Sequence, residues 1–143
     1  MRLTMVVPDV PAALNAALEG LVRVNVALLR AAIVVGRPVP PLYSSGIRYK
    51  REPVPREWWQ TIADNVVERV GDCEDLAAHR AAECRLAGLL VGIPYPARAV
   101  AIRTGRNTYH AVVRHPNGRI EDPSRALGMR APGQRRPPPG DRP

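Results

Sequence analysis

The chain has 143 residues, of which 45% are hydrophobic and 24% are charged, and it contains no phenylalanine. This length and composition fit one soluble globular domain whose core is built mainly from Ala, Val, Leu and Ile. The net charge is +8, but the basic residues are spread along the chain without a zinc-finger spacing, an RNP motif or a basic helix. We therefore expect no specific nucleic-acid binding.

An apolar stretch after Pro8 and Pro11 predicts a long helix over residues 12–35, which Gly36 closes. Such a helix either packs within its own domain or docks on a protein partner, and the sequence leaves both open. The stretch falls short of the ~20 apolar residues that cross a membrane. The early prolines also interrupt any secretory signal. We expect a protein of the cytoplasm that has no membrane contact.

Residues 37–55 carry five prolines and predict an extended connection with room for one short edge strand. Thr61 and Asp64 have the spacing of a capping box and predict a short helix over residues 62–69.

Alternating β-branched residues later in the chain predict three strands, over residues 97–104, 108–114 and 119–121. The last two flank Pro-Asn-Gly at residues 116–118 and should form a hairpin. Residues 130–143 hold five prolines and four arginines and predict a disordered basic tail.

The sharpest local feature is the Gly-Asp-Cys-Glu-Asp run at residues 71–75. Asp72 suits the N-cap position and Asp75 the N3 position of a capping box. Cys73 would then begin a helix that Gly88 ends. At that position the helix dipole favours a thiolate, and free backbone N–H groups can stabilise an oxyanion.

Three acidic neighbours oppose the activation of Cys73, because the dipole contributes only ~0.3–1 kcal/mol. An active thiolate would need a histidinium partner; without one, Cys73 is an inert cysteine at a capped helix start. Cys73 and Cys84 on one helix would lie roughly 16 Å apart, so both thiols should be free.

Three histidines are available as that partner. His79 lies six positions along the helix of Cys73, and His115 lies beside the hairpin turn; we expect both at the surface. His110 lies on a predicted strand, where its side chain faces either a core or a cleft.

The hairpin turn decides whether His110 has an acidic neighbour. The proline and glycine at positions 116 and 118 favour a three-residue loop that pairs His115 with Arg119. In that register His110 and Asp122 share a face of the sheet as diagonal neighbours. A two-residue Asn-Gly turn would place them on opposite faces.

Four motifs together resemble the transglutaminase-like superfamily. They are Gly-Asp-Cys-Glu-Asp-Leu-Ala at residues 71–77, Pro-Ala-Arg at 96–98, His-Ala-Val-Val at 110–113 and Glu-Asp-Pro-Ser at 121–124. With Trp-Gln-Thr at residues 59–61, they are most similar to the bacterial transglutaminase-like cysteine proteinases. The resemblance covers roughly residues 43–129. Two departures are Val112, where many relatives have tryptophan, and a longer loop before Pro-Ala-Arg.

The resemblance implies an α+β, papain-like fold in which the cysteine helix packs on a small antiparallel sheet. It assigns Cys73 as nucleophile, His110 as base and Asp122 as the acid that orients His110. The Cys73 backbone N–H would form the oxyanion hole together with Trp59 or Gln60. No metal or cofactor is expected.

The expected organisation is an N-terminal helix or docking segment (1–36), a transglutaminase-like catalytic domain (37–129) and a tail (130–143). The expected function is that of a cysteine peptidase or amidase, which cleaves peptide or isopeptide bonds of a protein substrate through a thioester. Superfamily members also crosslink, deamidate or deglycosylate, and some have lost catalysis. Because small proteins of this kind occur in phage genomes, the alternative is a structural component of a phage particle that docks through residues 12–35.

Overall fold

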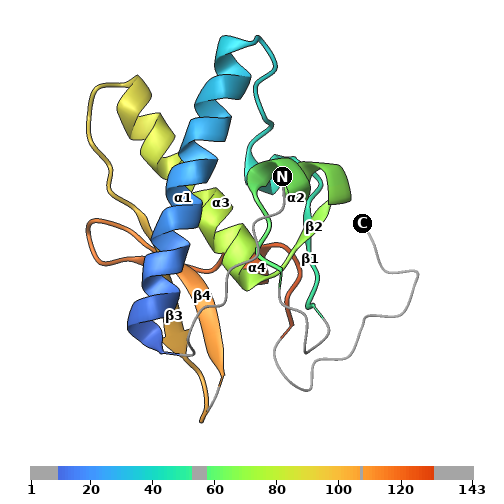
Figure 1. Cartoon of the computed structure of the whole chain (residues 1–143), viewed down its shortest axis with the longest axis vertical. Helices are drawn as coiled ribbons and strands as arrows, with labels where there is room; N and C mark the ends of the chain where they lie inside the picture. The colour runs from blue at the N-terminus through green and yellow to red at the C-terminus, as the bar shows by residue number, and fades with distance from the viewer. Residues whose placement is uncertain (1–9, 53–57, 107, 131–143) are drawn as a thin grey trace, which may run out of the picture.

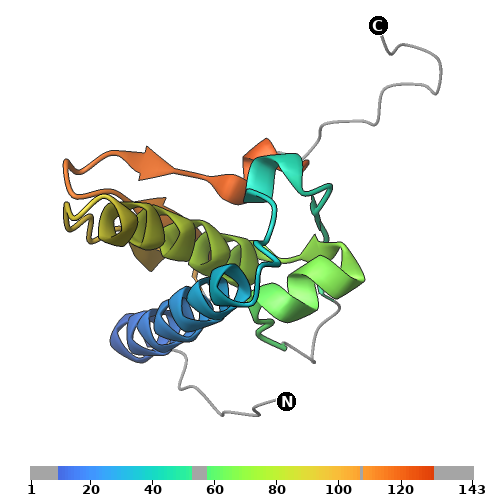
Figure 2. The ribbon, with the colours of Figure 1, turned by 90° about the horizontal axis from the view of Figure 1, so that it is seen from above.

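The computed structural model describes residues 10–52, 58–106 and 108–130. Two long helices pack against a three-stranded antiparallel sheet, and a smaller two-stranded sheet lies at the other side of the molecule (Figure 1). Seen from above, the blue helix α1 and the yellow-green helix α3 run side by side, with the orange hairpin strands along α3 (Figure 2). The predicted α+β class is therefore confirmed.

Helix α1 (Pro11–Val34) begins one residue before its predicted start and ends one residue early. Proline suits the first turn because the N–H that it lacks has no partner there. Leu18, Val22 and Leu29 recur on one face and are buried against α3 and β3. Buried Asn25 on the same face accepts a hydrogen bond from the Ile62 N–H at 3.0 Å. One face of α1 therefore packs within its own chain.

The connection after α1 contains a 3-10 turn, η1 (Leu42–Ser44), and the short strand β1 (Arg48–Tyr49). Helix α2 (Ile62–Glu68) carries the predicted capping box, and strand β2 (Val70–Gly71) follows it. Strands β1 and β2 pair in parallel. The sequence predicted the edge strand but not its partner, because a two-residue strand has no periodicity to detect.

Helix α3 (Cys73–Leu90) begins at the predicted residue but continues past Gly88, so the prediction that Gly88 ends it is wrong. This glycine serves packing instead of termination. A Cβ atom at position 88 would lie 2.5 Å from the Ile93 carbonyl oxygen, where the chain turns back across the helix. Gly92, with a φ of +72°, lies in the turn that follows.

The main sheet has the order β3 (Arg98–Arg103), β4 (Tyr109–Arg114), β5 (Ile120–Glu121), and the short helix α4 (Pro123–Ala126) follows it. The His115 N–H donates to the Arg119 carbonyl at 2.9 Å, and the Gly118 N–H donates to the His115 carbonyl at 2.9 Å. The hairpin thus has the predicted three-residue loop and register.

Alanines dominate the contact between α3 and the sheet. Ala77, Ala78 and Ala81 on the helix and Ala99 and Ala111 on the strands all belong to the buried core. Because these side chains are small, the helix lies close to the strands and contacts both β3 and β4.

None of the described helices is both long and apolar enough to span a membrane.

Candidate active site

Cys73 is the first residue of α3, and the local sequence fixes it there. The Asp75 N–H donates to Asp72 Oδ1 at 3.4 Å, and the Asp72 N–H donates to Asp75 Oδ2 at 3.2 Å. These two bonds form the capping box expected of Asp72 and Asp75. The Cys73 backbone N–H lies in the first helical turn, where N–H groups have no intrahelical acceptor.

The hairpin register brings His110 and Asp122 together. His110 Nε2 lies 2.9 Å from Asp122 Oδ2. Since a carboxylate only accepts, Nε2 carries the proton and the lone pair of the neutral imidazole resides on Nδ1. Asp122 is itself held by α4, because its Oδ1 accepts the Arg125 N–H at 3.2 Å and its Oδ2 lies 3.2 Å from Arg125 Nε.

Helix α3 places Cys73 against the strand that carries His110. The backbone N–H of Ala111, the next residue along β4, lies close enough to the Cys73 sulfur to lower the pKa of its thiol. In the described part of the chain, however, the side-chain partner of this sulfur is Glu74 and not His110. The Cys73 Sγ–H donates to Glu74 Oε2 at 3.0 Å.

The surroundings of Cys73 favour the neutral thiol. Burial raises the pKa of Cys73 most, and the negative charges of Glu74 and Asp72 raise it further, while the Ala111 N–H lowers it. The sequence already indicated that acidic neighbours oppose activation. It did not show that burial is the larger effect, because burial depends on the elements that fold over the first turn of α3.

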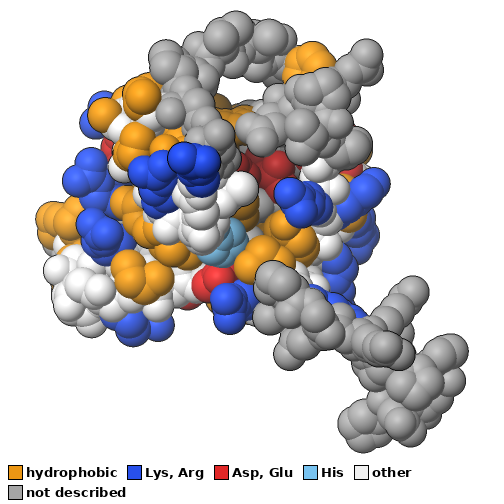
Figure 3. Space-filling view, turned by 90° about the horizontal axis from the view of Figure 1, so that it is seen from below, with side chains coloured by type: hydrophobic (Ala, Val, Ile, Leu, Met, Phe, Trp, Pro, Cys, Tyr) orange, Lys and Arg blue, Asp and Glu red, His pale blue; other side chains and the backbone are white. Residues whose placement is uncertain are grey.

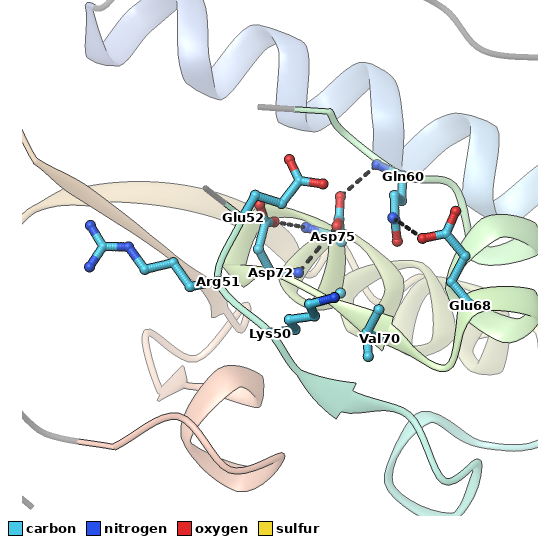
Figure 4. A pocket seen from close by; sticks show the side chains of 9 residues that line it. Lys50, Arg51, Glu52, Gln60, Glu68, Val70, Asp72 and Asp75 are labelled. Atoms are coloured by element: carbon cyan, nitrogen blue, oxygen red, sulfur yellow. Dashed lines mark hydrogen bonds between the residues drawn. The ribbon is translucent and has the colours of Figure 1, made fainter. Parts of the chain in front are cut away.

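A carboxylate-lined pocket of about 100 Å³ adjoins the capping box (Figure 4). Burial raises the pKa of Asp72 and Asp75, and negative neighbours raise it further. For Asp75, hydrogen bonds from the backbone of Gln60 and Asp72 act in the opposite direction. The lining residues are Lys50, Arg51, Glu52, Gln60, Glu68, Val70, Gly71, Asp72 and Asp75.

The two oxyanion candidates lie just before α2. The Gln60 backbone N–H donates to Asp75 Oδ1 at 2.6 Å, and its Nε2 donates to Glu68 Oε2 at 2.9 Å. Both bonds are visible in Figure 4, where the Gln60 side chain points to Glu68. Trp59 is partly buried against the core. In this arrangement Gln60 supports the capping box of Cys73.

The expectation that His79 and His115 lie at the surface is wrong. His79 is fully buried, and its Nε2 lies 3.5 Å from Glu83 Oε1. His115 is also buried, with Nδ1 2.9 Å from the Tyr95 hydroxyl. Both errors arise because distant segments cover these side chains, which local sequence does not reveal.

A cluster of polar side chains around the Glu121 carboxylate was also not predicted. Its oxygens accept from Arg80 Nε at 2.7 Å, contact His115 Nε2 at 2.7 Å and bond the Tyr43 hydroxyl. Glu121 therefore ties the two-residue strand β5 to α3 and to η1, directly beside Asp122. The sequence held one indication of this cluster: successive side chains of a strand point to opposite faces, so Glu121 had to point away from the face of Asp122.

His110 is the histidine of the three whose side chain is not buried. Viewed from below, the surface shows a histidine side chain among hydrophobic, acidic and basic side chains (Figure 3). Both Cys73 and Cys84 are free thiols.

Within residues 10–52, 58–106 and 108–130, no group of three or more His, Cys, Asp or Glu side chains is arranged to hold a metal ion. Comparisons of the chain with models of protein families, with curated proteins and with solved structures found no match.

Proposed function

We propose that the chain is a cysteine peptidase or amidase of the transglutaminase-like type. Cys73 is the nucleophile, His110 the base and Asp122 the orienting acid, on a papain-like core. The observation that carries the proposal is the 2.9 Å bond between His110 Nε2 and Asp122 Oδ2, on the strand β4 whose next residue, Ala111, lies beside the Cys73 sulfur. This bond leaves Nδ1 of His110 free to accept a proton.

The reaction follows from these roles. His110 Nδ1 takes the proton from Cys73 Sγ, and the thiolate attacks the amide carbonyl of a peptide or protein substrate. The Cys73 N–H stabilises the resulting oxyanion, with Trp59 as the candidate second donor, because the donor groups of Gln60 already bond Asp75 and Glu68. The His110 imidazolium then protonates the leaving amine, which leaves a thioester on Cys73. Water activated by His110 hydrolyses the thioester and restores the thiol.

Turnover of an undirected peptide mixture tests this proposal. The wild-type chain is incubated with a casein digest in water enriched in oxygen-18, and new carboxyl groups are detected by mass spectrometry. We expect wild type to incorporate the isotope, Cys73→Ala to incorporate none, and Cys84→Ala to match wild type. Incorporation that survives Cys73→Ala, or none by wild type in any peptide, would contradict the proposal.

A second candidate function is an assembly role, and one observation favours it. The ends of α1 and α3 expose large apolar side chains, including Val34 at 84% and Leu90 at 66%. A groove of about 290 Å³ lies between these helix ends and the segment that follows α1. Leu29, Ile33, Pro38, Val39, Pro41, Arg80, Glu83, Leu86, Ala87 and Leu90 line it. An apolar surface of this kind is typical of protein contacts.

Sedimentation velocity over a concentration series tests self-assembly through this surface. We expect the wild-type chain to associate and the double variant Val34→Asp, Leu90→Asp to remain monomeric with an unchanged circular dichroism spectrum. A wild-type monomer at every concentration would contradict self-assembly. Deletion of residues 1–36 is a poor test, because α1 contributes Leu18 and Val22 to the core.

A further inference from the structure

Glu74 is the side chain that holds the Cys73 sulfur. It occupies the second position of α3, and its Oε2 lies 3.0 Å from Cys73 Sγ. A carboxylate has no proton to donate, so the hydrogen in this contact belongs to the thiol. The charge of Glu74 also raises the pKa of Asp72, the residue that precedes Cys73.

The other groups around the sulfur come from three elements. At the start of α3 these are the carboxyl groups of the N-cap Asp72 and of Glu74. On β1 the neighbour is Tyr49, whose pKa is raised by burial and by the charge of Cys73. On β4 the Ala111 N–H reaches the sulfur, and His110 is the adjacent residue. Carboxylates favour the thiol, whereas the N–H and a protonated imidazole favour the thiolate. The protonation state of Cys73 therefore depends on whether its proton stays on the sulfur, facing Glu74, or moves to the imidazole of His110.

We propose that Glu74 is a latch that keeps Cys73 in a resting thiol form, and that reaction begins when the Sγ–H leaves Glu74 for His110 Nδ1. The inference rests on the proposed function, since it concerns the regulation of the same nucleophile. In this step the S–H bond breaks and an N–H bond forms on the imidazole. The proton carries its positive charge to the imidazole, and the sulfur keeps the electron pair. Glu74 is a positioning residue in this scheme and does not touch the substrate.

Thiol alkylation measures the latch without any substrate. The intact chain is treated with iodoacetamide from about pH 5 to about pH 10, and the peptides that contain Cys73 and Cys84 are quantified separately. In Glu74→Gln, the amide can donate to the sulfur where the carboxylate could only accept. We expect the midpoint of Cys73 alkylation to fall by about one pH unit, which is roughly tenfold faster alkylation near pH 7. The rate of Cys84 should not change.

Two further variants make the result decisive. Glu19→Gln removes the same charge from α1, at a residue whose partners are Arg85 and Arg23, and should leave Cys73 at its wild-type rate. Glu74→Ala removes the acceptor altogether and replaces Glu74→Gln if that variant misfolds by circular dichroism. An unchanged Cys73 rate in the Glu74 variant overturns the latch. A slower rate also overturns it, because Glu74 would then be the base that activates the thiol.

The latch and the catalytic proposal fail in distinguishable ways. Faster Cys73 alkylation in Glu74→Gln with no isotope incorporation into peptides by wild type supports the latch and contradicts the enzyme. Isotope incorporation by wild type with unchanged alkylation in Glu74→Gln supports the enzyme and contradicts the latch. His110→Gln separates the base from the latch, since it should slow Cys73 alkylation in the Glu74→Gln background.

Discussion

Replacing Asp72 with asparagine should stabilise the protein near neutral pH, although Asp72 caps the helix that begins with Cys73. Burial and the neighbouring carboxyl groups raise the pKa of Asp72 in the folded chain well above its usual value of 3.8. Folding at pH 7 therefore requires Asp72 to take up a proton. In the unfolded chain the pKa of Asp72 is near 3.8. Because pH 7 lies about three units above that value, protonating Asp72 on folding costs at most about 4 kcal/mol at pH 7.

Asparagine avoids this cost and keeps the local contacts. It is as good an N-cap as aspartate; its Oδ1 can accept the Asp75 N–H, and its amide can donate to Glu74. Part of the raised pKa of Asp72 comes from the charges of Asp75 and Glu74, which can take up protons in its place. We therefore expect Asp72→Asn to be more stable by only about 2 kcal/mol at pH 7. A raised folded pKa contributes stability that is complete below pH 3.8 and is lost as pH rises, so the gain should vanish near pH 4.

Urea unfolding followed by the fluorescence of Trp58 and Trp59 measures this difference. The free energies of unfolding of wild type and Asp72→Asn should converge near pH 4 and separate as the pH rises to about 9. A variant that is less stable than wild type by the same amount at every pH would refute the reasoning. Such a result would mean that Asp72 is ionised in the folded chain and acts only as a cap.

Three further predictions concern the fold and the site. Burial raises the pKa of Glu121, but hydrogen bonds from three side chains bring it down to about 2; its stabilisation is complete above pH 4.5 and lost towards pH 2. Allowing for partial exposure, Glu121→Gln should cost about 1–2 kcal/mol at pH 7 and much less near pH 2 in urea unfolding. Gly88→Ala should destabilise by about 1–3 kcal/mol in the same assay, whereas Gly20→Ala, with open space around the new Cβ, should stabilise by about 0.5–1 kcal/mol; equal effects would contradict the packing role of Gly88. Asp122→Asn should lower peptide turnover by roughly 10²–10⁴-fold while leaving the secondary structure intact, and an unchanged rate would remove Asp122 from the site.

The features that the sequence predicted correctly are those with local causes. The start of α3 at Cys73 follows from an aspartate at the N-cap and a second one three residues later, a pattern that acts within one helical turn. The register of the hairpin follows from the Pro-Asn-Gly turn, and it alone determines that His110 meets Asp122. Both halves of the candidate site could therefore be read from short segments.

The features that the sequence did not predict depend on contacts between distant segments. His115 is buried because the Tyr95 hydroxyl and the Glu121 carboxylate hold it. Position 88 is a glycine inside the helix, and not a helix stop, because residues 93–95 pass too close to leave space for a side chain. The contact between Glu74 and Cys73 is local, but its importance depends on how deeply α3 is buried, which no single window of sequence contains.

The residues that begin α3 have opposing effects on stability and on reactivity. Asp72 and Asp75 fix the helix start, and so fix where the Cys73 sulfur lies. Asp72 and the adjacent Glu74 also disfavour the thiolate that the proposed reaction requires. A serine at the N-cap would hold the helix equally well without an acidic group beside the sulfur. The acidic cap therefore matters chemically: it places the Cys73 sulfur where neighbouring carboxyl groups favour the thiol, and in the proposed reaction proton transfer to His110 on β4 produces the reactive form.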